Sequence, residues 1–77
     1  MKIYEILVGG ARNVHSFMIR FEVTAPNEAV AWEMVENYSQ QNQLGELAQL
    51  QITCLRAAPE GSGPRVKQLM GSGSSGF

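Results

Sequence analysis

The chain has few of the residues that form cross-links and metal centres. Its 77 residues include one cysteine, Cys54, and one histidine, His15. A single cysteine cannot close an internal disulfide, and one cysteine with one histidine cannot supply the four ligands of a structural zinc site. We therefore expect no disulfide-stabilised or zinc-stabilised scaffold, no metal and no other cofactor.

Long apolar runs and a strong net charge are also absent. No apolar stretch approaches the roughly 18 to 20 residues that span a membrane, and Met1 to Glu5 lacks the pattern of a secretory signal. Six basic and seven acidic residues give a formal net charge of −1, which creates no overall field for nucleic acid or anionic lipid. We expect a soluble, cytoplasmic protein that does not bind membranes.

The length and the apolar content predict one domain with one core. Hydrophobic residues make up 44% of the chain and charged residues 17%. We expect a compact domain over residues 1–57 and a C-terminal tail over residues 58–77. A domain of about 57 residues buries only about 60% of the surface of its unfolded chain, so self-association or a larger partner would add needed stability.

The first third of the chain predicts a β-hairpin. Lys2 to Val8 is rich in β-branched, aromatic and aliphatic residues, and Gly9-Gly10 predicts a turn from Gly9 to Asn13. Val14 to Thr24 then alternates with the period of two that is typical of a half-buried strand. The side chains expected to face the core are Phe17, Ile19, Phe21 and Val23.

A helix should follow, beginning at Ala25-Pro26-Asn27-Glu28 and ending near Gln41. Pro26 suits the first helical position, where its missing N–H has no partner to lose, and Glu28 places a carboxylate in the positive first turn. Successive residues of an α-helix lie 100° apart around its axis, so the apolar residues of this segment form one stripe and the polar residues form the opposite face. The stripe contains Ala31, Met34, Val35 and Tyr38, and the polar face contains Glu33, Glu36, Asn37 and Gln40.

A third strand is predicted from Ala48 to Ala57, with Leu50, Ile52 and Cys54 on one face. The fold class is therefore α+β, in the order hairpin, helix, strand (ββαβ). Short, uncrossed connections place the third strand antiparallel beside the first, which gives a three-stranded sheet of order 2-1-3 with the helix on one face.

The C-terminal tail has a different composition. Pro59 to Gly63 predicts a hinge, Arg65 to Met70 is a short basic and apolar segment, and the last seven residues have the composition of a flexible linker. These seven residues are either a native tail or an added linker. The tail as a whole is expected to be flexible and to help complete the domain.

The central first strand is the main indication of function. Ile3 and Leu7 face one side of the sheet, and Tyr4, Ile6 and Val8 face the other, but one helix covers only one side. An uncovered apolar sheet face usually marks a contact with another molecule. The partner-binding residues that we predict lie on this face, on the helix flank and in the tail: Met18, Arg20, Trp32, Leu55, Arg56, Arg65 and Lys67.

Trp32 has a second interpretation. It lies at the flank of the helix stripe, about 100° from its centre. A tryptophan there can cover the edge of the core, which is the more common case. It can also anchor a partner, because tryptophan, tyrosine and arginine supply much of the binding energy of interfaces.

No set of residues predicts catalysis. His15 and Ser16 are neighbours on a strand and point to opposite faces, so they cannot pair directly. Glu33 and Glu36 belong to the solvated face of the helix. Cys54 is expected on the same side of its strand as Leu50 and Ile52, which favours a small buried residue over a reactive thiol. We expect a non-enzymatic module that binds a protein partner or a second copy of itself, with no small-molecule substrate.

Nucleic-acid binding is the alternative. A local patch could form from Arg12, Arg20, Arg56, Arg65 and Lys67, with Tyr4 and Phe17 as the strand aromatics for base stacking. That patch would make the chain a small RNA- or ribosome-associated module. The aromatics of the second strand are expected to face the core, which disfavours this alternative.

The order of hairpin, Ala-Pro-Asn-Glu helix start and strand over residues 2–57 resembles several small α+β proteins in outline. They include archaeal ribosomal LX-type domains and compact phage or mobile-element proteins, such as inhibitors of CRISPR complexes. The resemblance implies either a ribosome-associated module or a phage or mobile-element accessory or inhibitor protein.

Overall fold

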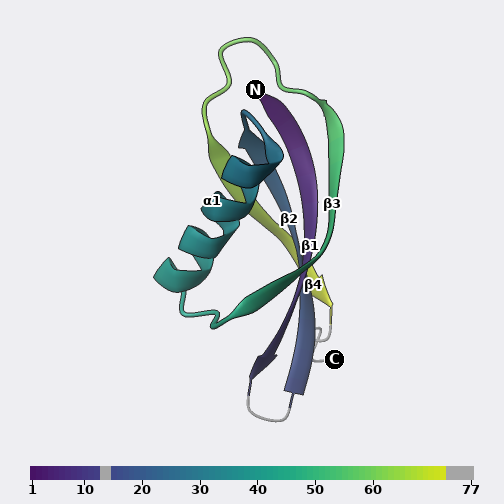
Figure 1. The fold of residues 1–77 in the computed structure, drawn as a ribbon, viewed down its shortest axis with the longest axis vertical. Coiled ribbons are helices and arrows are strands. Elements are labelled where there is room, and N and C mark those ends of the chain that lie inside the picture. Colours follow the sequence, from purple (N-terminus) through teal and green to yellow (C-terminus); the bar gives the residue numbers. More distant parts are fainter. Residues whose placement is uncertain (13–14, 73–77) are drawn as a thin grey trace.

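A computed structural model describes residues 1–12 and 15–72. Their order is ββαββ: β1 (Lys2–Arg12), β2 (His15–Ala25), α1 (Glu28–Gln41), β3 (Leu47–Ala57) and β4 (Arg65–Ser72). The strands form one antiparallel sheet of order β3-β1-β2-β4, and α1 lies across one of its faces (Figure 1). The expected α+β class is confirmed.

The fourth strand corrects the predicted sheet. The three predicted strands are neighbours in the expected order, with β1 beside both β2 and β3, but a three-stranded sheet is wrong because β4 adds to the free edge of β2. Residues 58–64 cross one end of the sheet to reach that edge (Figure 1). Of the tail, residues 65–72 therefore belong to the sheet.

The glycine pair does not form the predicted turn. Gly9 and Gly10 lie inside β1, opposite Met18 and Phe17 of β2 and opposite Ala48 and Leu47 of β3. A β-carbon at Gly10 would come within 2.5 Å of the Phe17 ring, so Gly10 gives that ring room to lie on the strand. The hairpin thus extends to Arg12, and Asn13 and Val14 lie outside the described residues.

The helix begins two residues later than the proline rule predicts. Asn27 is the N-cap, with an extended backbone, and its side-chain oxygen accepts a 2.9 Å hydrogen bond from the Val30 N–H. Pro26 therefore precedes the cap and is not the first helical residue. Glu28 does lie in the first turn, and the helix ends at Gln41 as expected.

The core lies between α1 and one face of the sheet. Alternate residues of β1 and β2 point toward the helix, and Ala31 and Val35 of α1 meet them, as the stripe predicted. Phe21 is fully buried, and its ring meets that of Tyr38 edge to face at 5.4 Å between centroids. The buried cluster consists of Tyr4, Ile6, Val8, Ile19, Phe21, Val23, Ala25, Ala31 and Val35.

Two irregularities divide β3. Its register against β1 shifts between Gln49 and Gln51 and again between Cys54 and Arg56, which leaves Leu50 and Leu55 as extra residues. Each extra residue shifts the alternation of side chains by one position. For this reason Leu50 does not share the face of Ile52, and the predicted face of Leu50, Ile52 and Cys54 is wrong.

Cys54 is exposed, although it lies two positions after Ile52 and points to the same side of the sheet. Its partner in register, Tyr4, is buried, but Cys54 lies on the outermost strand. Side chains at the edge of a sheet have a neighbour on one side only. The expectation of a buried thiol at this position is therefore wrong.

Within residues 1–12 and 15–72, no helix is both long enough and apolar enough to cross a membrane.

Candidate interaction surface

The sheet has a second face that α1 does not cover, which we call the open face. Because side chains alternate along a strand, the residues between the core positions point to this side. Their register across the four strands places the following residues on the open face: Ile3, Glu5, Leu7 and Gly9 of β1, Met18, Arg20, Glu22 and Thr24 of β2, Gln51, Thr53 and Arg56 of β3, and Arg65 and Lys67 of β4.

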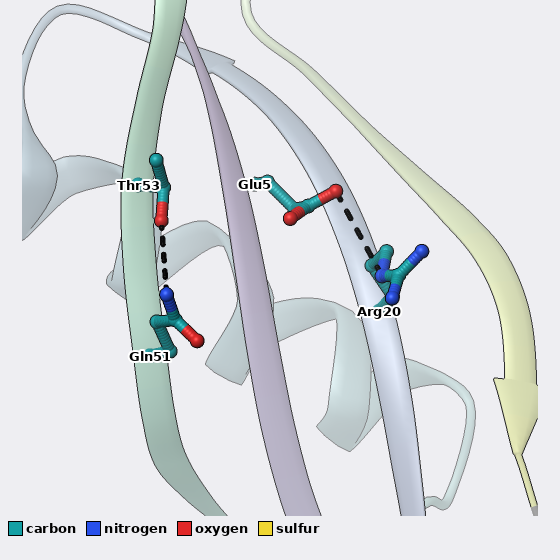
Figure 2. Close-up of polar contacts among 4 residues, drawn as sticks. All are labelled: Glu5, Arg20, Gln51 and Thr53. Carbon is teal, nitrogen blue, oxygen red and sulfur yellow. Dashed lines mark hydrogen bonds and ion pairs between the residues drawn. The ribbon is translucent and has the colours of Figure 1, made fainter.

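Charges of both signs lie in the middle of the open face. The Arg20 Nε lies 3.7 Å from the Glu5 Oε2, and both side chains are substantially exposed. Glu22 lies opposite Glu5 on one side and opposite Lys67 on the other. Figure 2 shows the Glu5 and Arg20 pair on the side of the sheet away from the helix. This centre is polar and carries both signs of charge.

The β3 part of the open face is uncharged around Gln51 and Thr53. The Gln51 Nε2 donates to the Thr53 Oγ1 at 3.5 Å, along the same strand (Figure 2). Thr53 lies opposite Glu5 and Gln51 lies opposite Leu7. A neutral strip therefore runs along β3 beside the charged centre.

Apolar side chains of β2 and β3 are exposed as well. Met18 is 41% exposed, Leu50 54% and Leu55 42%. Leu50 lies over Gly9, because a β-carbon at Gly9 would meet its side chain at 3.2 Å. The glycine lets the leucine side chain lie flat on β1, on the open face. Ile3 differs from these residues, since it is 6% exposed and lies outside the helix-side cluster.

Most of the predicted partner-binding residues come together. Met18, Arg20, Arg56, Arg65 and Lys67 share the open face, and Leu55 is the exposed extra residue beside Arg56. The sequence pattern missed Leu50, because only the bulge moves it to this face.

Trp32 does not join the other predicted residues. It is half-buried on α1 and packs against the core on the covered side of the sheet. Its position is that of a side chain covering the edge of the core, the more common of the two interpretations given to it. An interface on the open face does not include it.

No group of three or more histidine, cysteine, aspartate or glutamate residues within the described residues is placed to hold a metal ion. Glu33 and Glu36 are exposed on the outer side of α1, as predicted for a solvated face. The side chain of His15 lies outside the described part of the chain.

The aromatic residues considered for base stacking are on the covered side. Tyr4 is buried in the core cluster and Phe17 packs against it. Arg12 was part of the same predicted patch, but its side chain is not among those described. On the described part of the open face, the arginine and lysine side chains therefore have no aromatic side chain beside them.

Comparison with known proteins found no match: no family model, no curated protein and no solved structure is similar to this chain. The open face is thus interpreted from its own chemistry.

Proposed function

We propose that this chain is a small non-enzymatic protein-interaction module whose open sheet face binds a macromolecular partner. The observation that carries the proposal is the difference in cover between the two faces of one sheet. One face packs against α1, and the other presents Met18 and Leu50 to solvent beside a charged centre. Exposed apolar side chains gathered on one surface are typical of interaction sites.

The chemistry of the open face favours a protein partner over nucleic acid. Arg20 has Glu5 beside it, and Lys67 has Glu22 opposite it, so acidic groups offset two of the four basic residues of the open face. The other two, Arg56 and Arg65, lie opposite the uncharged Ile3 and Thr24. Phosphate backbones are bound by uncompensated basic patches, and single-stranded bases by exposed aromatic rings. Apolar side chains around charges of both signs suit a protein surface with a complementary pattern.

The test is a comparison of two charge-introducing variants in one binding assay. Proteins retained by the immobilised full chain are identified, and the retained candidate is purified and titrated against wild type, Met18→Asp and the control Gln40→Asp. Gln40 is exposed on the outer side of α1. We expect Met18→Asp to weaken binding at least tenfold and Gln40→Asp to leave it within twofold of wild type.

Two results would overturn the proposal. One is loss of binding in Gln40→Asp with full binding in Met18→Asp, which would move the site to the helix side. The other is a purified partner that is RNA, or binding that nuclease treatment abolishes and that weakens steeply with salt, which would establish the nucleic-acid alternative.

A further inference from the structure

One row of residues across the open face carries two arginines. The register aligns Arg56 of β3 with Ile3 of β1, Ile3 with Thr24 of β2, and Thr24 with Arg65 of β4. We call these four residues the arginine row. Both arginines are exposed, and neither forms an ion pair with another described residue. The row therefore presents two positive charges to solvent.

The two arginines of the row stand well apart. β3 and β4 are the outermost strands of the sheet, so three strand spacings, about 14 Å in all, separate the backbones of Arg56 and Arg65. Side chains stand roughly perpendicular to a sheet, which keeps the two charges separate. A guanidinium group binds a carboxylate through two parallel hydrogen bonds. The spacing suits two carboxylates on one protein surface better than one small anion.

The arginine row offers charge and almost no apolar area. Ile3, between the two arginines, is 6% exposed although α1 lies on the other side of the sheet. The exposed apolar side chain of Met18 lies six residues along β2 from Thr24, about 20 Å away. The open face thus has a charged end and an apolar end, and charge decides what the charged end binds.

The charge of the open face is opposite in sign to that of the chain as a whole. Four basic and two acidic residues lie on this face, whereas the net charge of the chain is −1. The helix carries Glu28, Glu33 and Glu36 and neither lysine nor arginine. An acidic partner is therefore attracted by the open face and repelled by α1, which orients its approach.

From this charge pattern we infer that the partner of the open face is a protein with an acidic surface, whose carboxylates bind Arg56 and Arg65. The inference rests on the proposed function, because it names the chemistry of the partner at the same site. The open face of a second copy does not fit this description, since both faces have the same excess of positive charge.

The acidic residues beside the row favour a protein over a nucleic acid. Glu22 lies two residues before Thr24 on β2, and Glu5 lies opposite Glu22, so two carboxylates border the row about 7 Å away. A nucleic-acid backbone carries a charge at every nucleotide and meets these carboxylates as well as the arginines. A protein surface can place its carboxylates over the arginines alone.

The first arm of the test titrates labelled poly-L-glutamate with each protein variant at about 50 mM salt, followed by fluorescence anisotropy. The variants are Arg56→Glu, Arg65→Glu and the control Lys2→Glu, which changes the net charge by the same amount. Lys2 is exposed at the same end of β1, but its partner in register, Ala25, belongs to the helix-side core cluster. Lys2 is thus matched in charge and place but lies on the other side of the sheet.

We expect wild type to bind poly-L-glutamate, and each arginine variant to bind it at least fivefold more weakly. Lys2→Glu should stay within twofold of wild type. The neutral variants Arg56→Gln and Arg65→Gln should weaken binding in the same order, so the result does not depend on the tolerance of the fold for new carboxylates. Circular dichroism confirms that each variant is folded before it is scored.

The second arm replaces poly-L-glutamate with the protein purified in the test of the open face. The double variant Arg56→Gln/Arg65→Gln should bind that protein at least tenfold more weakly, mainly through a slower association rate. If this double variant binds like wild type while Met18→Asp does not, the inference is wrong and the proposed function stands. If neither variant loses binding, the proposed function is wrong as well.

Three further results would overturn the inference. One is a wild type that does not bind poly-L-glutamate at millimolar concentration, and another is equal weakening in Lys2→Glu and Arg65→Glu. The third is tighter binding of poly-uridylate RNA than of poly-L-glutamate, which would make the arginine row a nucleic-acid contact.

Discussion

The two faces of β1 and β2 are built from alternating residues of the same strands, yet their environments differ sharply. Ile6 and Phe21 lie opposite each other and are fully buried beneath α1. Their neighbours in sequence, Glu5 and Glu22, lie opposite each other on the open face, with Arg20 and Lys67 nearby. The covered face holds the hydrophobic core of the fold, and the open face is the surface on which we propose that a partner binds.

Among side-chain truncations, the largest effect is expected at Phe21. Phe21→Ala removes a fully buried ring and its edge contact with Tyr38, and such truncations cost about 3–5 kcal/mol. Chemical denaturation at one fixed protein concentration measures the loss. Met18→Ala on the open face is the control and should cost under about 1 kcal/mol. Equal losses in the two variants would mean that the faces do not differ as described.

Gly10 tests how far the covered face extends toward the hairpin end. A β-carbon there would come within 2.5 Å of the Phe17 ring and 3.0 Å of the Leu47 side chain. Gly10→Val should therefore displace that ring and destabilise the chain by about 1–3 kcal/mol. Gly63→Val is a control, since a β-carbon at Gly63 meets nothing within 4 Å. A neutral Gly10→Val would mean that Phe17 does not pack on β1 there.

Asn27 tests the attachment of the helix that covers one face. Asn27→Ala removes the hydrogen bond to the Val30 N–H and should destabilise the chain by about 1 kcal/mol. Asn27→Asp retains an acceptor at the cap and should recover most of the loss. If the alanine and aspartate variants unfold at the same denaturant concentration, the cap is not the stabilising contact.

The smallest effect is expected for the ion pair on the open face. A double-mutant cycle with Glu5→Gln and Arg20→Gln should give a coupling of roughly 0.2–0.5 kcal/mol, because exposed pairs are solvated and screened. The coupling should shrink further in 1 M salt. A coupling above about 2 kcal/mol would show that this part of the open face stabilises the fold, contrary to the comparison.

The sequence predicted the elements whose side chains alternate regularly or follow a helical stripe. Phe17 to Val23 alternate along β2, and Ala31 to Tyr38 line one side of α1, because burial against one partner imposes a strict period. The same periodicity predicted that Met18 would lie on the face away from the helix, but it left open which side of β1 the helix covers. Most of the candidate surface followed from this alternation.

The fourth strand could not be predicted in the same way. Val66 of β4 packs against the core, but Gln68, two residues later, bonds instead to the Tyr38 hydroxyl, which donates to its side-chain oxygen at 3.0 Å. The strand is held largely by backbone pairing with β2, which leaves little trace in a hydrophobic pattern. What did point to a fourth strand was the unpaired edge that β2 would have in a three-stranded sheet.

The bulges of β3 could not be predicted from the sequence pattern either. Leu50, Ile52 and Cys54 alternate perfectly in sequence, and only the register with β1 shows that one residue is extra. Gly9 is what allows Leu50 to lie on the open face, and that contact joins two segments far apart in the chain. A single-strand period cannot detect a contact of this kind.

One pair of substitutions tests the central claim most directly. Met18 and Ile19 are adjacent on β2, with Met18 41% and Ile19 6% exposed. The measurement is the free energy of unfolding of Met18→Lys and Ile19→Lys. We predict that Met18→Lys stays within about 1 kcal/mol of wild type, while Ile19→Lys loses its cooperative transition, because an unpaired charge cannot be buried beneath the helix. If Met18→Lys unfolds the chain as Ile19→Lys does, the open face is part of the core and the division between the two faces is wrong.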